Sequence, residues 1–194
     1  MNKARQTLKS EYFDALYAAD PDPWNFAASP YEQAKYRLTL NAMPELHYRS
    51  ALEVGCSIGV LTRLLASRCD SVVAIDAAET PLIEARRRCA DLPGVRFEQM
   101  FAPDEWPDGE FDLILLSEVV YYFGRKDVGR LADRVTRSLV KDGFVILVHW
   151  TGETNYPLSG DEAAALFIKE VGPTCVVERA ERHQEFRLDV LSRK

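Results

Sequence analysis

A loop of small residues carries the first chemical signal in this sequence. The segment EVGCSIG (53–59) follows an apolar run and leads directly into a segment of helical period. Small residues at positions 55, 57 and 59 allow a tight turn and a close approach of the backbone to a ligand at the start of a helix. A nicotinamide-binding GxGxxG loop would need glycine at 57 and 60, where this chain has Ser57 and Val60. The loop therefore predicts a ligand site of another kind, and a tight turn without a ligand is the alternative.

Two carboxylates stand near the ends of apolar runs. Glu53 lies two residues before the first glycine of the loop, and Asp76 ends the next run. A carboxylate beside a pyrophosphate would be repelled, but it suits a ligand that carries an ammonium group. An acidic side chain at the end of the second strand can accept hydrogen bonds from ribose hydroxyls. Together the two residues favour a nucleoside ligand with a cationic group, and capping or surface placement is the alternative for both.

Polar and aromatic residues follow two later apolar runs. Glu118, Tyr121 and Tyr122 come after one run, and His149 follows the other. A hydroxyl acceptor needs a base, and His149 is the histidine best placed for that role. Glu118 is a second candidate base, or a group that binds a cationic acceptor. The alternatives are a structural histidine, a helix cap at 118 and core packing of the tyrosines.

Four continuous apolar runs position these residues. They span residues 51–54, 71–75, 113–116 and 144–148. Continuous rather than alternating runs are typical of strands that are covered on both faces. Segments of helical period separate them: one starts at Pro81, and another covers 128–139 and is expected to stop at Asp142-Gly143. Such alternation predicts a parallel, doubly wound sheet.

The pattern changes in the last part of the chain. A weaker strand is expected at 95–99, and a short helix near 161–170 precedes two alternating segments at 175–180 and 186–191. The last two segments are too close for a crossover helix, so they should pair as an antiparallel hairpin. We therefore predict an α/β fold in three layers, with a doubly wound, seven-stranded, mostly parallel sheet and an antiparallel C-terminal hairpin.

Residues 1–48 differ from the rest in their dense aromatic content. Two amphipathic stretches are separated by a proline-rich turn that holds Trp24, and Tyr31 follows it. We predict a single domain, in which residues 1–48 form a helical cap on an α/β core of residues 49–194. The cap would cover the edge of the sheet where open α/β folds bind ligands.

These motifs resemble class I S-adenosylmethionine-dependent methyltransferases, and the similarity covers most of the chain. Four segments look like motifs of that family: LEVGCSIG (52–59), AIDAA (74–78), FDLILLSEVVYYF (111–123) and LVKDGFVILVH (139–149). Ser57 replaces the usual middle glycine of the first motif. The resemblance implies a Rossmann-like fold, S-adenosylmethionine as the methyl donor and S-adenosylhomocysteine as the product.

The resemblance also implies a set of cofactor-binding residues. Glu53 and the backbone carbonyl near Ser117 would take the ammonium of the cofactor, and Lys35 its carboxylate, unless Lys35 lies on a solvated helix face. Phe101, after Met100, stands where the family often has an acidic residue toward adenine, so adenine recognition would rest on backbone groups and apolar packing. Aromatic faces suit a sulfonium. The full set is Trp24, Tyr31, Lys35, Glu53, Gly55, Cys56, Ser57, Gly59, Asp76, Ala77, Met100, Phe101, Ser117 and Tyr121.

A narrower resemblance concerns the reaction. The segments DPW (22–24), SPYE (29–32) and SEVVYYF (117–123) are similar to the nodulation-S-like N-methyltransferases. This implies N-methylation of an amino sugar or a similar small amine, with His149, Tyr122 and Glu118 as catalytic candidates. O-methylation of a hydroxylated metabolite, and a cofactor-binding regulatory protein without turnover, stay open.

Composition excludes several other classes. The chain has 194 residues with 24 Lys+Arg against 30 Asp+Glu, a net charge of −6, which disfavours nucleic acids and anionic membranes as partners. Its four cysteines form no CxxC pair or Cys/His cluster, so we expect no metal site. Without an apolar leader or a long apolar run, a cytoplasmic protein is expected. The acceptor and the oligomeric state are not predicted.

Overall fold

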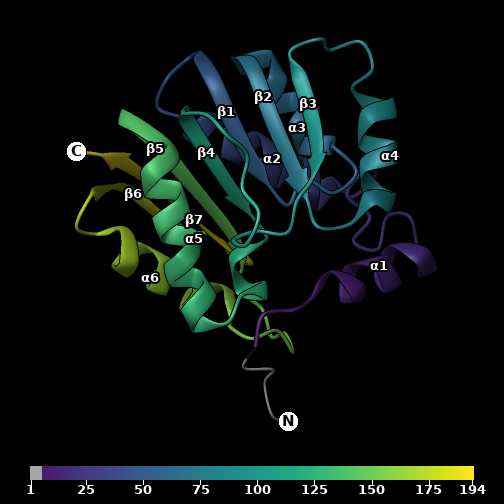
Figure 1. The fold of residues 1–194 in the computed structure, drawn as a ribbon. Coiled ribbons are helices and arrows are strands. Elements are labelled where there is room, and N and C mark those ends of the chain that lie inside the picture. Colours follow the sequence, from purple (N-terminus) through teal and green to yellow (C-terminus); the bar gives the residue numbers. More distant parts are fainter. Residues whose placement is uncertain (1–5) are drawn as a thin grey trace. The chain divides into compact units, whose positions relative to one another are not determined.

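A computed structural model describes residues 6–194 as an α/β fold (Figure 1). Two short 3-10 helices, η1 (Ala66–Arg68) and η2 (Val120–Tyr122), accompany the longer elements. Those elements are α1 (Ser10–Ala19), α2 (Pro30–Ala42), β1 (Tyr48–Val54), α3 (Val60–Leu65), β2 (Cys69–Asp76), α4 (Glu79–Arg88), β3 (Val95–Gln99), β4 (Phe111–Ser117), α5 (Arg125–Ser138), β5 (Leu139–Trp150), α6 (Gly160–Val171), β6 (Cys175–Arg182) and β7 (Phe186–Arg193).

The described strands form one seven-stranded sheet in the order β3-β2-β1-β4-β5-β7-β6. Strand β7 runs antiparallel to both β5 and β6, whereas β1, β2 and β3 are parallel. The predicted α/β class, the mostly parallel sheet and the antiparallel C-terminal hairpin are therefore confirmed. Residues 1–5 of the predicted cap lie outside the described residues, and the division at residue 48 stays a prediction.

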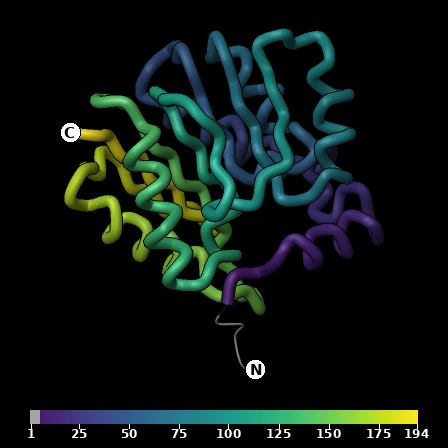
Figure 2. Tube along the Cα trace, viewed as in Figure 1, coloured from purple at the N-terminus to yellow at the C-terminus, as the bar shows by residue number. Residues whose placement is uncertain are grey.

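The described chain divides into two compact units. One unit contains residues 9–107, and the other contains residues 6–8 and 108–194. In the first unit, β2 pairs with β1 on one side and with β3 on the other, so that Val54 lies opposite Ile75 and Asp76 opposite Gln99. Helix α1 contacts α4 (Figure 2). The register places the carboxyl ends of the three strands, with Glu53 and Asp76, at the same edge.

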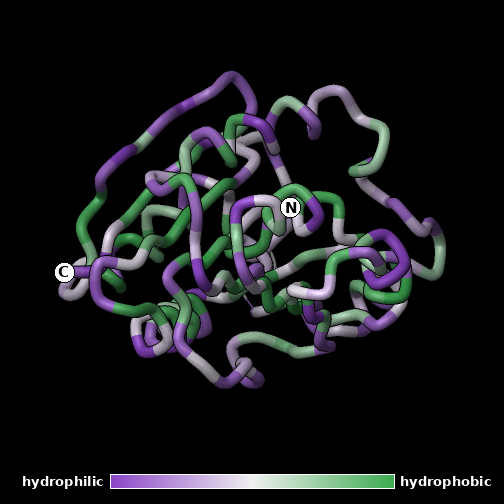
Figure 3. Tube along the Cα trace, turned by 90° about the horizontal axis from the view of Figure 1, so that it is seen from above, coloured by the Kyte–Doolittle hydropathy of each residue, from purple (hydrophilic) through white to green (hydrophobic). Residues whose placement is uncertain are grey.

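The second unit is built on β4, β5, β7 and β6. Helices α5 and α6 pack against each other beside these strands (Figure 1). Residues 113–116 and 145–148 are at most 1% exposed. Figure 3 shows hydrophobic and hydrophilic stretches following one another along the chain. Burial on both faces explains why these strands have continuous rather than alternating apolar sequences.

Two predicted helix boundaries were wrong. Helix α5 ends at Ser138, because the next residue, the fully buried Leu139, already pairs with Phe111 in the sheet. Asp142 and Gly143 lie inside β5, and Asp142 has a φ of 61°, next to an irregularity in the β4–β5 pairing. The turn residues therefore bend a strand instead of ending a helix. Helix α4 begins at Glu79, two residues before Pro81.

None of the helices within residues 6–194 is both long enough and apolar enough to cross a bilayer.

Candidate active site

The β1–α3 loop is held in left-handed backbone conformations. Gly55, Ser57 and Gly59 have φ values of 79°, 50° and 74°. The amides of Gly55 and Cys56 both donate to the carbonyl of Ile75, at 2.8 and 3.1 Å. A Cβ atom on Gly59 would lie 2.9 Å from the Cβ of Ala85, so only glycine fits the close packing of this loop on α4. The loop thus turns sharply at the end of β1.

Glu53 is buried without a full set of hydrogen-bond partners. Its side chain is 2% exposed, and Oε2 has no hydrogen-bond partner among residues 6–194. Burial raises the pKa of Glu53 to about 8; the Thr62 hydroxyl opposes this rise, and the charge of Asp76 adds to it. A buried carboxyl without a donor is costly in free energy. The site therefore fits a ligand that brings a cationic donor, such as an ammonium group, to Oε2.

Asp76 ties the loop to the end of β2. Its Oδ2 accepts the amide of Ser57 at 2.8 Å, and its Oδ1 accepts the amide of Ala78 at 3.0 Å. Burial raises the pKa of Asp76 to about 6, and these backbone donors oppose the rise. Each carboxylate oxygen can accept more than one hydrogen bond, so ribose hydroxyls could still bind here. Within the loop, Cys56 is buried, which raises its pKa and keeps it a thiol.

The N-terminal candidates of the same unit are engaged in packing and ion pairing. Lys35 is only 2% exposed, and its Nζ lies 2.9 Å from Oε1 of Glu32 and 5.1 Å from the centre of the Tyr31 ring. The alternative that Lys35 lies on a solvated helix face is therefore wrong. Trp24 stacks on Phe26 with ring centres 5.4 Å apart.

The loop after β3 contains Glu105, an acidic residue that was not among the predicted site residues. The amide of Met100 donates to the carbonyl of Asp76 at 2.9 Å, and that of Phe101 donates to Oε2 of Glu105 at 2.7 Å. The carbonyl of Ala77 accepts the side-chain amide of Gln99. The acidic composition of the loop after β3 was the only sequence signal for Glu105.

In the second unit, Glu118 is held in a strained conformation directly after β4. Its φ is 56°, which is uncommon for a residue other than glycine. Its Oε2 accepts the hydroxyl of Tyr121 at 2.8 Å and the amide of Trp150 at 2.9 Å. Strained residues of this kind cluster at functional sites. The contacts fix the carboxylate of Glu118 near the end of β5.

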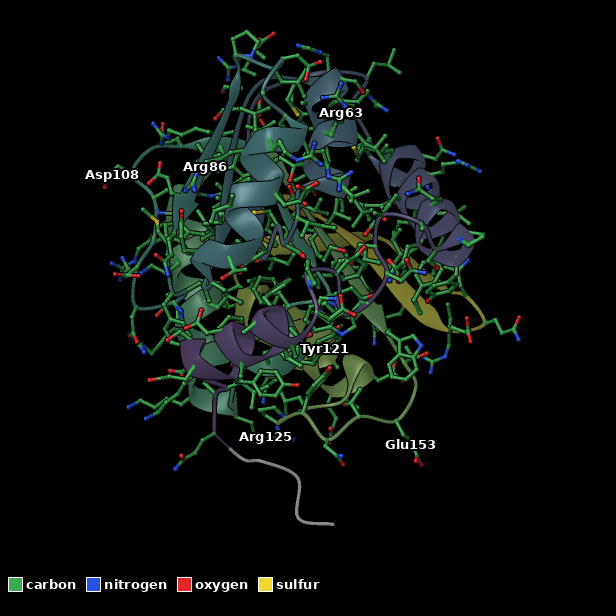
Figure 4. All side chains as sticks on the ribbon, turned by 90° about the vertical axis from the view of Figure 1, so that its right-hand side faces the viewer. Arg63, Arg86, Asp108, Tyr121, Arg125 and Glu153 are labelled. Carbon is green, nitrogen blue, oxygen red and sulfur yellow. The ribbon has the colours of Figure 1, made fainter. Side chains whose placement is uncertain are left out.

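Tyr121, whose hydroxyl contacts this carboxylate, packs with two further tyrosines and forms what we call the tyrosine cluster: Tyr121, Tyr122 and Tyr156. Tyr121 stacks on Tyr156 with ring centres 5.1 Å apart, and Tyr122 meets both rings edge-on at 4.7 Å (Tyr121 is labelled in Figure 4). Burial raises the pKa of Tyr121 and of Tyr122 well above the usual value, so both phenols stay neutral. Sequence reasoning missed Tyr156, because it lies in an irregular loop without a motif.

His149 lies on β5 beside the cluster. Its ring is fully buried, its Nε2 accepts the amide of Val120 at 3.1 Å, and its centre lies 5.4 Å from that of Tyr121. A ring nitrogen that holds a backbone amide is not available to take a proton from a substrate. The geometry therefore favours the alternative of a structural histidine that positions η2.

The structure brings the sequence candidates together in two groups. Residues 9–107 hold the loop, Glu53, Asp76 and the β3 end, whereas Ser117, Glu118, the tyrosines and His149 belong to the other unit. Among residues 6–194, no group of three or more His, Cys, Asp or Glu side chains is arranged to hold a metal ion. The first group can receive a cationic nucleoside, and the second presents a carboxylate among aromatic rings.

Comparisons with known proteins identify the family of this chain. Nodulation protein S of Rhizobium tropici is 33% identical over 135 residues, 66% of this chain and 55% of the relative. A protein of known structure from Pseudomonas syringae is 36% identical, with a TM-score of 0.75 over 84% of this chain and 99% of its own. The N-methyltransferase NodS from Bradyrhizobium japonicum WM9, solved with S-adenosylhomocysteine, has a TM-score of 0.80 at 20% identity, over 95% of this chain and 97% of its own, which shows a shared fold.

The chain spans about half the length of the first curated relatives it matches. A family model for nodulation protein S (NodS) matches residues 6–148, which is well over half of the chain. The chain therefore belongs to the nodulation protein S (NodS) family.

Proposed function

We propose that this protein transfers a methyl group from S-adenosylmethionine to the nitrogen of a small-molecule amine, such as an amino sugar. The buried Glu53, whose Oε2 lacks a hydrogen-bond partner among the described residues, carries the proposal, because it fits the ammonium of this cofactor. The Bradyrhizobium japonicum relative is an N-methyltransferase that binds S-adenosylhomocysteine, and this supports both the cofactor and the choice of nitrogen. A cytoplasmic location stays a prediction.

The residues of the first unit would bind and orient the cofactor. When bound, S-adenosylmethionine supplies an electrophilic methyl group on a sulfonium. Glu53 would pair with the ammonium, and Asp76 would accept ribose hydroxyls while it keeps the amides of Ser57 and Ala78. Lys35 would have to exchange Glu32 for the cofactor carboxylate, since its ammonium lies 2.9 Å from Glu32. No metal is required, because positioning and exclusion of water account for this type of displacement.

The residues of the second unit would bind the acceptor. A carboxylate that contacts one ring of a three-tyrosine cluster attracts a cation or an amine by its charge, and the negative faces of aromatic rings add to this attraction. The hydroxyl of Tyr121 and the amide of Trp150 orient Glu118 for this contact. Because Tyr121 and Tyr122 stay neutral, neither is a base. The amine would react as its free base, so the rate should follow the pKa of the acceptor.

O-methylation is the second candidate, and the structure gives it less support. A hydroxyl acceptor needs a general base at the moment of transfer. His149 was the sequence candidate for that base, but its Nε2 holds the amide of Val120 and its ring is fully buried. The nitrogen acceptor needs no such base, and we therefore favour it.

The test compares acceptors that differ only in the reacting group. Glucosamine and glucose, and ethanolamine and ethylene glycol, are incubated with the protein and S-adenosylmethionine, and mass spectrometry follows methylated product and S-adenosylhomocysteine. We expect methylation of at least one amine and of neither hydroxyl partner, with a rate that rises with pH through the pKa of the amine. Methylation of a hydroxyl compound alone would support O-methylation. Binding of S-adenosylhomocysteine without any transfer would support the regulatory protein.

A variant separates the acceptor site from the cofactor site. Glu118→Gln should raise the KM of the methylated amine about tenfold or more through loss of the charge, and should leave the affinity for S-adenosylhomocysteine within about twofold of wild type. Glu153→Gln, which changes an exposed carboxylate in the loop after β5 (Figure 4), is the matched control and should behave as wild type. Equal KM values for wild type and Glu118→Gln would remove Glu118 from the acceptor site.

A further inference from the structure

We infer that Tyr17 is a positioning residue for the cofactor loop and acts through the hydroxyl of Ser57. This inference rests on the proposed function in one respect, namely that the loop 53–59 binds the cofactor. The phenol of Tyr17 donates to Oγ of Ser57 at 2.6 Å, and both side chains are buried. Helix α1, which carries Tyr17, lies far from the loop in the sequence, and no motif links the two.

Ser57 needs support because of its backbone conformation. Its φ of 50° is in the left-handed region, where a residue other than glycine costs about 1–2 kcal/mol. Two hydrogen bonds hold it there: its amide donates to Oδ2 of Asp76 at 2.8 Å, and its hydroxyl accepts the phenol of Tyr17. A chain of contacts therefore runs from α1 through the loop to the carboxylate that would hold the ribose.

Tyr17 is itself held firmly enough to act as an anchor. Its ring forms a buried cluster with Ile58 and Ala78, the residues that follow Ser57 and Ala77 in the two ligand-binding loops. The ring of Trp24 packs edge-on against it, with ring centres 5.8 Å apart. Burial and the charge of Asp76 raise the pKa of Tyr17, so the phenol keeps the proton that it donates to Ser57.

This arrangement explains the serine at position 57. A glycine would adopt the same φ without strain and without help from α1. A serine adds strain but also an oxygen, and that oxygen ties the loop to Tyr17. Tyr17 and Ser57 thus form one functional pair, and the phenol of Tyr17 should have no effect on the loop once the Ser57 hydroxyl is removed.

A double-mutant cycle tests the pair. Tyr17→Phe, Ser57→Gly and the double variant are compared by calorimetric titration with S-adenosylhomocysteine. Loss of the hydrogen bond in Tyr17→Phe should weaken binding about 5- to 10-fold, whereas the double variant should bind within about twofold of Ser57→Gly alone. The KM for S-adenosylmethionine should rise by a similar factor in Tyr17→Phe, with kcat at saturation nearly unchanged. Tyr12→Phe, the same change on the same helix at a residue that is 36% exposed, is the control.

Hydrogen exchange of the ligand-free protein gives a readout that does not depend on binding. The peptide that contains residues 53–62 should exchange faster in Tyr17→Phe than in wild type, and equally fast in Ser57→Gly and the double variant. The inference would be overturned if Tyr17→Phe changed binding and hydrogen exchange equally in the wild-type and Ser57→Gly backgrounds, or if it changed them in neither background. A wild type that fails to bind S-adenosylhomocysteine would contradict the proposed function, while hydrogen exchange would still decide the role of Tyr17.

Discussion

Two glutamates at the ends of parallel strands have opposite surroundings. Glu53, the next-to-last residue of β1, is buried, and its Oε2 has no hydrogen-bond partner among the described residues. Glu118, directly after β4, accepts the hydroxyl of Tyr121 and the amide of Trp150 on one oxygen. Burial raises the pKa of Glu53 to about 8. Similar positions in the topology therefore give two carboxyls different hydrogen-bonding surroundings.

The difference separates two uses of an acidic side chain. A carboxyl that receives donors from its own chain is fixed by the fold and can present a charge at a defined point. A carboxyl that is buried without a donor destabilises the free protein, and a cationic ligand that supplies the donor relieves this cost. We therefore expect removal of the Glu53 charge to weaken ligand binding and to stabilise the free protein.

The largest expected effect is that of Glu53→Gln on the cofactor site. Loss of the buried charge should weaken S-adenosylhomocysteine binding about 100-fold, since truncating one partner of a buried charge pair costs about 2–5 kcal/mol. At pH values above 8, the free energy of unfolding of the ligand-free variant should be higher than that of the ligand-free wild type. Calorimetric titration and urea unfolding measure the two quantities, with the exposed Glu110→Gln as control. A fall in both affinity and stability would instead mean that Glu53, like Glu118, is a carboxyl that its own chain stabilises in the free protein.

The second prediction concerns the pH dependence of stability. The pKa of Glu53 is about 8 in the folded protein, above its ordinary value of 4.5, so between these values the folded state binds more protons than the unfolded state. The free energy of unfolding should therefore fall as pH rises, by about 1.4 kcal/mol per pH unit over most of this range. Asp76 has the same sign, with a pKa of about 6 against 3.8.

The window from pH 6 to pH 8 separates Glu53 from Asp76, because the pKa of Asp76 lies at its lower end. Urea unfolding of the ligand-free protein across this window should show the slope in wild type and lose it in Glu53→Gln. The variant should keep the slope that Asp76 produces at lower pH. A wild type whose stability is constant between pH 6 and pH 8 would show that Glu53 is ionised in the free protein throughout this window.

The third prediction tests the role of His149 in the second unit, where the acceptor would bind. His149→Leu leaves the buried amide of Val120 without an acceptor, which should cost about 1–3 kcal/mol of stability. His149→Gln can offer a carbonyl oxygen to the same amide and should lose less than half as much. The pH–rate profile with an amine acceptor should be the same in His149→Gln and wild type. A profile that loses its acidic limb, where the rate rises with pH, in His149→Gln would restore His149 as the base and favour a hydroxyl acceptor.

Much of the fold could be predicted because burial leaves a clear pattern. Strand β3 has the predicted bounds 95–99, and the runs at 113–116 and 144–148 lie within β4 and β5. The end of α5 could not be predicted, because Asp142-Gly143 fits both a helix end and a bend in a strand. Only the pairing of Leu139 with Phe111, a contact between distant residues, decides between them.

The candidate site residues also divide into those that the sequence predicted and those that it did not. Glu53 and Asp76 were found because they adjoin strand ends, where spacing in the sequence gives position in the fold. Tyr17 and Tyr156 were missed as site residues, since each reaches its partners through long-range packing from a segment without a motif. The burial of Lys35 was missed for the same reason: the sequence of α2 does not show what covers it.

The smallest expected effect is that of an exposed carboxyl, Asp91. Arg63 donates two hydrogen bonds to it, at 2.6 and 2.8 Å, and lowers the pKa of Asp91 to about 2 (Arg63 is labelled in Figure 4). The stabilisation is present above the ordinary pKa of 3.8 and is lost as pH falls through about 2. Because both side chains are exposed, water and salt screen the pair.

Asp91→Asn should therefore shift the urea midpoint at neutral pH less than His149→Leu does, and high salt should abolish the shift. Asp91 resembles Glu118 in having donors from its own chain and differs from it in exposure. If Asp91→Asn destabilised the protein as much as Glu118→Gln, hydrogen-bond donors alone would determine how much a carboxyl contributes to the free energy of unfolding. A clearly smaller effect would show that burial sets the size of the contribution. Burial is also the property that makes Glu53, whose Oε2 has no donor among the described residues, the more sensitive of the two strand-end glutamates.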